Sequence, residues 1–194
     1  LWWIREVRSR QVKPSTASDY EHRYRKTISP HLGRKAIADI TTADVVSWSS
    51  QLETQYAPDS VNGSLRVLKM ILRAAVDMDY CRKNVASSVP GVPKTGPGRA
   101  ERLKWSDYQV AMAVQSAEEH WFGPAVVLAV ILGMRKGEVI ALKWADVDLE
   151  RNQIHIRRAR REFSIYGDDG RGHIEATEGS PKTRSSVRSF PLPP

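Results

Sequence analysis

The chain has 194 residues, enough for one large domain or two small ones. It is 41% hydrophobic and 27% charged, a composition that suits a folded globular protein and argues against wholesale disorder. The net charge of +8 indicates a polyanionic partner, either nucleic acid or an acidic membrane surface. Residues 1–100 carry +7, residues 101–150 carry −3 and residues 151–194 carry +4, so two basic regions flank a mildly acidic centre.

The single cysteine, Cys81, excludes an internal disulfide framework and zinc-finger spacing, and a reducing compartment is the default. The longest apolar run, residues 124–134, is too short to span a bilayer. The opening "LWWIREVRSR" is not a signal peptide, because arginines follow its short apolar part at once. We expect the chain to begin inside a longer open reading frame, since it lacks an initiator methionine.

The first region is predicted to be helical. One helix is expected to start near Pro14, with Ser15 or Thr16 as its N-cap. Another is expected to start after Thr41, whose spacing from Asp44 resembles a capping box. The predicted buried face of this second helix consists of Val45, Trp48 and Leu52.

The most regular pattern predicts a helix from about Pro58 to Asp79, because proline suits the first helical position and apolar residues follow in steps of four and three. A second stripe, polar and basic, runs one residue later. A solvated face would explain it, but its cations have no acid among them. Gly63 lies nearby, where a backbone could approach closely, so DNA contact is a real alternative. The apolar stripe is Val61, Leu65, Leu68, Leu72 and Ala75, and the basic stripe is Asn62, Arg66, Lys69 and Arg73.

Prolines and glycines crowd the segment that follows, which predicts an interdomain linker over residues 90–100. The linker would join a first domain, residues 1–89, to a second, residues 101–194. It is basic at Lys94 and Arg99.

The second region is predicted to begin with helices. One runs from about Ser106, its N-cap, to Ala117, and a buried helix over residues 124–132 ends at Gly133. A short helix follows within "KGEVIALKW".

Strands are predicted after these helices. "NQIHIRR" alternates apolar and polar residues, which indicates a strand with Ile154 and Ile156 on one face. Residues 166–180 are expected to form a loop rich in Gly and Asp, and the surroundings of Val187 resemble another strand. The fold class is therefore mainly α with a small antiparallel β ribbon.

The stretch "GMRKGEVIALKWADVDL" resembles the first catalytic box of the tyrosine recombinase (phage integrase) family. "SPKTRSSVRSFPLP" resembles the ribbon that carries that family's catalytic lysine. The resemblance implies a helical, SAM-like core-binding domain followed by an incomplete α+β catalytic domain. The positions of the first box are Gly133, Met134, Arg135, Lys136, Gly137, Glu138, Leu142, Trp144 and Asp146.

The resemblance implies that Arg135 clamps the reacting phosphate, that Glu138 orients the site, and that Lys182 protonates the leaving oxygen. The chemistry suits these residue types, because a guanidinium meets two phosphate oxygens with a planar fork and stays protonated. A lysine whose pKa neighbouring arginines lower is a competent acid. Solvent-exposed side chains, or for Glu138 an ordinary first-turn acid, are the structural alternatives. The predicted DNA-binding residues are Arg66, Lys69, Arg73, Lys94, Arg99, Arg157, Arg184 and Arg188.

The family's second box, His-x-x-Arg, and its nucleophilic tyrosine would come after the ribbon, and the sequence stops at Pro194. "HRYR", which contains His22 and Arg25, and "HIRR", which contains His155 and Arg158, are interpreted as chance matches. No tyrosine occupies the nucleophile's place, so the chain itself is not expected to form a phosphotyrosyl bond. No metal or cofactor is expected, because ligand-spaced His, Cys and acidic clusters are absent from the sequence.

The resemblance implies site-specific recombination or integration of double-stranded DNA by the full-length protein, through a 3′-phosphotyrosyl intermediate and a homotetramer in a synaptic complex. The expected location is the cytoplasm of a bacterial host, at the nucleoid, with no membrane partner. Two alternatives stay open. One is a catalytically inert DNA-binding module that competes for recombination sites. The other is a basic helical RNA-binding protein, for which no motif of stacking aromatics is visible.

Overall fold

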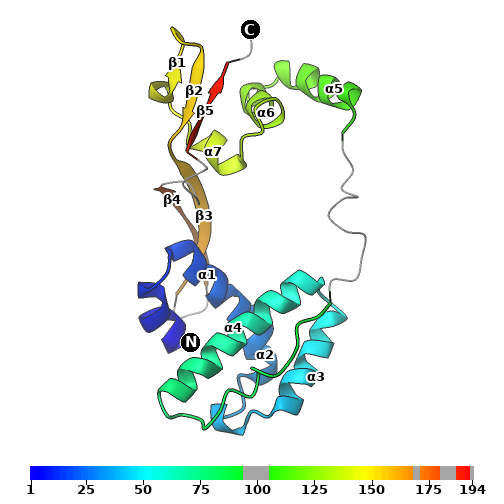
Figure 1. Cartoon of the computed structure of the whole chain (residues 1–194), viewed down its shortest axis with the longest axis vertical. Helices are drawn as coiled ribbons and strands as arrows, with labels where there is room; N and C mark the ends of the chain where they lie inside the picture. The colour runs from blue at the N-terminus through cyan, green and yellow to red at the C-terminus, as the bar shows by residue number, and fades with distance from the viewer. Residues whose placement is uncertain (94–104, 168–170, 180–186, 193–194) are drawn as a thin grey trace. The chain divides into compact units, whose positions relative to one another are not determined.

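The structure is a computed structural model that describes residues 1–93, 105–167, 171–179 and 187–192 (Figure 1). It divides into two compact units. Unit 1 comprises Leu1–Gly98 and Phe163–Ile174, and unit 2 comprises Arg99–Glu162 and Glu175–Pro194. The grouping of Phe163–Ile174 with the N-terminal helices was not expected from the sequence. The domain ranges proposed around a linker at residues 90–100 stay a prediction, since compactness alone does not establish independent folding.

Unit 1 is built from helices. Pro14 is the first residue of its helix and Lys13 is the N-cap, with no side-chain hydrogen bond, so the expectation of a Ser15 or Thr16 cap was wrong. Proline's fixed φ and missing N–H suit it to the first helical position, which places the cap one residue before it. The elements are η1 (Trp3–Val7), η2 (Arg8–Arg10), α1 (Pro14–Arg23), η3 (Tyr24–Ile28), α2 (Ser29–Leu32), η4 (Ile37–Asp39), α3 (Thr42–Glu53) and α4 (Pro58–Asp77).

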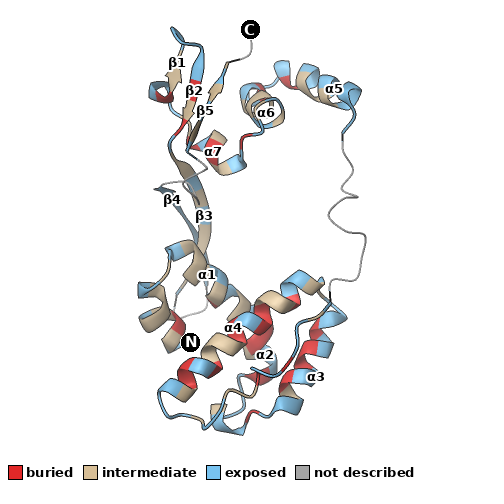
Figure 2. Cartoon of the chain, in the orientation of Figure 1, coloured by how far each residue is buried: buried red, intermediate tan, exposed pale blue. Residues whose placement is uncertain are grey.

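The core of unit 1 lies between α3 and α4. The capping box is confirmed: the Thr41 side chain accepts from the backbone of Asp44, whose side chain accepts from the backbone of Thr41. The α3 face is buried as predicted, and the Trp48 indole donates a hydrogen bond of 2.7 Å to the Thr27 carbonyl. The apolar stripe of α4 is also buried, visible as the red face of that helix in Figure 2. The spacing of apolar residues and the Thr41 capping box therefore predicted α3 and the buried face of α4 correctly.

Unit 2 begins with helices α5 (Asp107–Glu118), α6 (Gly123–Val130) and α7 (Lys136–Ile140), followed by the 3-10 turn η6 (Trp144–Asp146). Ser106 caps α5 through the backbone of Gln109, as expected.

The prediction that residues 124–132 are buried was wrong. Most residues of α6 are half-buried or exposed, and Gly123 is the buried one. Beside α6, an open apolar groove of about 460 Å³ is lined by residues that include Leu128, Leu142 and Ile154. The run is apolar enough for a core, but no other described element covers this face.

The strands of unit 2 form a small sheet in the order β1–β2–β5, from β1 (Val147–Asp148), β2 (Gln153–Ile156) and β5 (Arg188–Pro191). Both pairings are antiparallel, with Ile154 opposite Phe190. Ile154 and Ile156 are buried on one face with Met134, as the alternation predicts. The fold class expected from the sequence, mainly helical with small antiparallel sheets, is confirmed.

A second sheet pairs β3 (Ala159–Tyr166) with β4 (Gly172–Gly179), so the expectation of a loop over residues 166–180 was wrong for residues 172–179. All residues of β4 are exposed. A strand without a buried face has no alternation of apolar and polar residues, which is the signal that identifies strands from sequence. Among the described helices, none combines the length and apolar character needed to cross a bilayer.

Candidate functional site

The turn between α6 and α7 positions the arginine that the sequence singles out. Gly133 adopts a left-handed φ of 61°, Met134 is buried, and Arg135 is the N-cap of α7. A Cβ on Gly137 would lie 2.5 Å from the carbonyl oxygen of Arg160, so a glycine is required where α7 meets the backbone of β3. The close approach of the β3 backbone therefore explains why position 137 of the box is a glycine.

Glu138 is a buried acid that pairs with the exposed Arg135. Its side chain is 2% exposed, whereas that of Arg135 is 68% exposed. One Glu138 oxygen accepts from the Arg135 backbone N–H at 2.9 Å, and the other accepts from Nη1 of the same residue at 2.9 Å. The carboxylate therefore fixes both the backbone and the side chain of Arg135, while most of that side chain's surface faces solvent.

Arg188, from β5, binds the same carboxylate. Its Nη1 and Nη2 donate to the two oxygens of Glu138 at 3.0 and 2.9 Å, a bidentate pair. Its guanidinium also lies 4.9 Å from the centre of the Phe190 ring. The sequence predicts Arg188 as a DNA contact, which stays a prediction. The pairing with Glu138 was not predicted, because residues so distant in sequence carry no local signal of contact.

The electrostatics of Glu138 favour its charged form. Desolvation by burial raises the pKa, but hydrogen bonds from the Arg188 side chain and from the backbone and side chain of Arg135 outweigh it. The pKa falls from 4.5 to about 2. The cluster therefore holds a buried negative charge between two guanidinium groups at neutral pH.

A second buried carboxylate lies at the end of the same box. Asp146 is 1% exposed and accepts from Nη2 of Arg158 at 2.9 Å and from the Lys143 backbone at 3.2 Å. Arg157, a predicted DNA contact, is 56% exposed, with its Nη1 3.8 Å from Asp146. Arg158 therefore pairs with Asp146. Its neighbour three residues earlier, His155, instead shares a hydrogen bond of 2.8 Å with Ser189.

The basic stripe of α4 divides into residues with different surroundings. Arg66 is exposed and has no hydrogen bond or ion pair with the described part of the chain. Lys69 donates to the carbonyls of Val89, at 2.7 Å, and Ser87, at 3.4 Å. Arg73 is 72% exposed and pairs with Asp77, one turn on, at 3.0 Å. Contact with DNA stays a prediction for all of these cations, and Lys69 also has a structural role.

Gly63, whose missing side chain was interpreted as room for DNA, faces the chain itself. A Cβ there would lie 2.3 Å from Nη1 of Arg23. Arg23 donates to the Ser60 carbonyl at 3.2 Å and pairs with Asp19 at 2.9 Å. The glycine therefore accommodates a guanidinium from α1.

Several predicted residues fall outside the described ranges, so the structure places none of their side chains. The predicted ribbon lysine is among them. These residues are Lys94, Arg99, Lys182 and Arg184.

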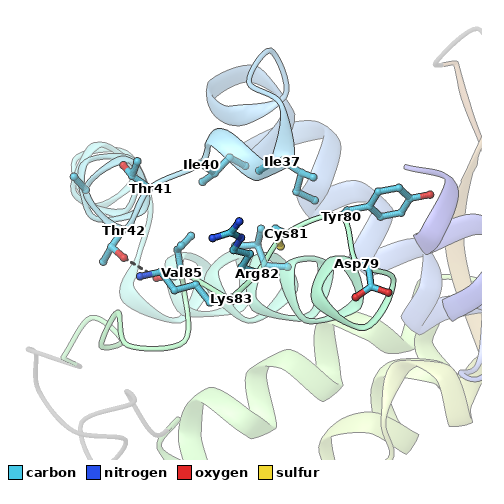
Figure 3. Close-up of a pocket in the computed structure, with 13 residues that line it drawn as sticks. Ile37, Ile40, Thr41, Thr42, Asp79, Tyr80, Cys81, Arg82, Lys83 and Val85 are labelled. Carbon is cyan, nitrogen blue, oxygen red and sulfur yellow. Dashed lines mark hydrogen bonds between the residues drawn. The ribbon is translucent and has the colours of Figure 1, made fainter.

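A pocket of about 870 Å³ in unit 1 lies between the start of α3 and the segment after α4 (Figure 3). Thr42 donates to the Val85 carbonyl at 3.2 Å across it, and Arg82 and Lys83 lie alongside. It shares no residue with the predicted site. Among the described residues, no group of three His, Cys, Asp or Glu side chains is arranged to hold a metal ion.

Residues 2–92 match the family model described as the phage integrase central domain. A tyrosine recombinase XerC-like protein of Caldanaerobacter subterraneus is 27% identical over 98% of this chain and 50% of its own length. The ICEBs1 integrase of Bacillus subtilis is 25% identical over 91% of this chain and 45% of its own length. The chain thus spans about half the length of these relatives.

Solved structures share the fold. The Tn1549 transposon integrase, in complex with a circular intermediate DNA, aligns with a TM-score of 0.67 at 22% identity, over 98% of this chain and 60% of its own. A lambda integrase tetramer bound to a Holliday junction aligns with a TM-score of 0.67 at 21% identity, over 80% of this chain and 43% of its own.

The chain is similar to tyrosine recombinases over nearly all of its length, and residues 2–92 match the phage integrase central domain, so the resemblance inferred from residues 133–146 is confirmed.

Proposed function

We propose that the protein to which this chain belongs recombines double-stranded DNA at specific sites, and that residues 1–194 form a DNA-binding part of it. One observation carries the proposal: a buried carboxylate, Glu138, holds two arginines in a fixed arrangement and leaves Arg135 mostly exposed. Guanidinium groups fixed in this way are suited to bind phosphate oxygens without further ordering.

The role proposed for Arg135 is contact with the phosphate at which the DNA strand is cleaved. Negative charge on the nonbridging oxygens grows as a phosphodiester opens, and a fixed cation stabilises it. Glu138 acts as a positioning residue, because its hydrogen bonds orient Arg135 rather than reach the DNA. Lys182 is proposed as the acid that protonates the leaving oxygen. Arg66, Arg73 and Arg157 are exposed cations proposed to bind the DNA backbone.

The complete reaction is proposed for the whole protein. Cleavage through a phosphotyrosyl intermediate would need a nucleophile from outside residues 1–194. Assembly as a homotetramer and action at the host's nucleoid, in the bacterial cytoplasm, are further parts of the proposal. The homotetramer is supported by a lambda integrase tetramer bound to a Holliday junction, a protein of the same fold.

A duplex-binding experiment tests the DNA-binding role. We expect the purified chain to bind a fluorescent duplex of about 30 base pairs, with an affinity that falls steeply as salt rises. A single-stranded RNA of equal length serves as the competitor. Absence of duplex binding at low salt, or displacement of the duplex by equimolar RNA, would contradict the proposal.

The alternative is an inert module that occupies recombination sites without chemistry, and the contacts of four of the six tyrosines favour it. Tyr20, Tyr24 and Tyr56 pack against the unit 1 core, and the Tyr166 hydroxyl is hydrogen-bonded to His22. On a nicked suicide duplex, we expect no covalent adduct from residues 1–194. An adduct would show that this account of the nucleophile is wrong. A reading frame that continues past Pro194 into His-x-x-Arg and a later tyrosine would favour the recombinase over the competitor.

A further inference from the structure

The tip of the β3–β4 sheet, Phe163–Ile174, packs with the N-terminal helices in unit 1. We infer that this tip is a docking element whose binding surface is one face of α1 and η3 together with Arg5, and that Tyr166 is its anchor. These contacts lie within unit 1 and bring together segments far apart in sequence. The inference concerns the architecture of the chain and does not depend on the proposed function.

The binding surface is formed by residues that helical spacing places on one face. Ser18, His22 and Arg25 follow one another in steps of four and three, which places them on one face. Ser18 Oγ donates to the Ser164 carbonyl at 2.6 Å, and His22 Nδ1 shares a hydrogen bond of 2.8 Å with the Tyr166 hydroxyl. The Arg25 guanidinium lies 5.1 Å from the centre of the Tyr166 ring. Successive turns of the helix therefore contact successive parts of the tip.

Glu21 positions Arg5 and Arg25 for contact with the tip. Its side chain is 11% exposed, and one of its oxygens accepts from Nε of Arg5 at 3.2 Å and from Nε of Arg25 at 3.0 Å. Both arginines then donate to the Gly167 carbonyl, at 3.1 and 3.4 Å, and Arg5 also donates to the Tyr166 carbonyl. The carboxylate holds both guanidinium groups toward the same short backbone segment, so part of the docking surface is arranged through Glu21.

Several of the contacts converge on one residue, Tyr166. Its hydroxyl, its ring and its carbonyl each have a partner on the helical surface: His22, Arg25 and Arg5. The His22 and Arg25 pair is the sequence "HRYR", whose resemblance to the family's second box was attributed to chance. The structure gives the pair a different role, recognition of the tip.

The docking has a topological consequence. The chain passes between the units at residues 98/99, 162/163 and 174/175. Cutting the chain between residues 98 and 99 therefore places the tip and its helical surface on different fragments, which makes the interaction measurable.

The experiment places a protease site between Gly98 and Arg99 of the full chain and cleaves the folded protein. We expect the two fragments to elute together in size-exclusion chromatography. Tyr166→Ala is expected to raise their dissociation constant by at least about tenfold, and Tyr166→Phe, which keeps the ring over Arg25, by less. Tyr108→Ala, at a 74% exposed tyrosine on α5, is the matched control and should leave the constant unchanged.

A second measurement uses the uncut chain, in case a fragment fails to stay folded. Amide hydrogen exchange of residues 163–167 should be slow in the wild type, faster in Tyr166→Ala and in His22→Ala, and unchanged in Tyr108→Ala. Two results would overturn the inference. One is that the wild-type fragments separate while exchange at the tip is already fast. The other is that Tyr166→Ala matches the wild type in both measurements.

Discussion

Arg188 binds Glu138 through both of its terminal nitrogens, at 3.0 and 2.9 Å, although 50 residues separate the two in sequence. The pair joins α7 to β5, and through Glu138 it also reaches Arg135. The same carboxylate thus supports the packing of unit 2 and the position of the residue proposed to bind the reacting phosphate.

Removing the carboxylate should destabilise unit 2. Glu138→Ala deletes hydrogen bonds to both arginines and leaves their charges facing one another, which we expect to lower the free energy of unfolding by about 3 kcal/mol. Urea unfolding monitored by circular dichroism measures this change. Glu150→Ala, at an exposed acid, is the control and should change stability by less than about 0.5 kcal/mol. Equal stability of the two variants would mean that the Glu138 cluster is not structural.

The low pKa of Glu138 makes stability depend on pH. Because its pKa is about 2 in the folded chain, below the ordinary 4.5, the stabilisation is present above pH 4.5 and is lost as pH falls toward 2. The shift corresponds to at most about 3 kcal/mol. In Glu138→Gln, the fall in unfolding free energy between pH 5 and pH 2.5 should be smaller than in the wild type. Parallel pH profiles of the two proteins would contradict the assignment.

The sequence predicted the parts of the fold that periodicity and capping determine. The stripe of α4 and the Thr41 capping box are local patterns, and both are confirmed. Burial of residues 124–132 and a loop over residues 172–179 were predicted wrongly, because the covering of α6 depends on segments distant in the chain and β4 has no buried face to give an alternating pattern.

For the site, the sequence identified the arginine box by its resemblance to a family motif. It did not reveal that Arg188 and Arg158 pair with Glu138 and Asp146. An arginine that binds a carboxylate and one that binds a phosphate look alike in sequence, and the fold alone determines which partner is near.

The cations of α4 should differ in their effects on DNA binding. Arg66→Ala is expected to reduce the slope of log K against log salt by about one, as for one lost phosphate contact. Lys69→Ala should in addition lower stability, because Lys69 also binds the Val89 carbonyl. Fluorescence anisotropy over a salt series and thermal unfolding measure the two effects. An unchanged slope in Arg66→Ala would remove this face of α4 from the DNA interface.

The most direct test of the proposed DNA-binding role concerns the exposed side of Arg135. Arg135→Gln and Arg151→Gln are matched variants, because both arginines are mostly exposed and pair with a carboxylate three residues away in sequence. The salt dependence of duplex binding should lose about one unit of slope in Arg135→Gln and none in Arg151→Gln. If the two variants bind duplex DNA with the same affinity and the same slope as the wild type, Arg135 does not contact phosphate and the proposal fails.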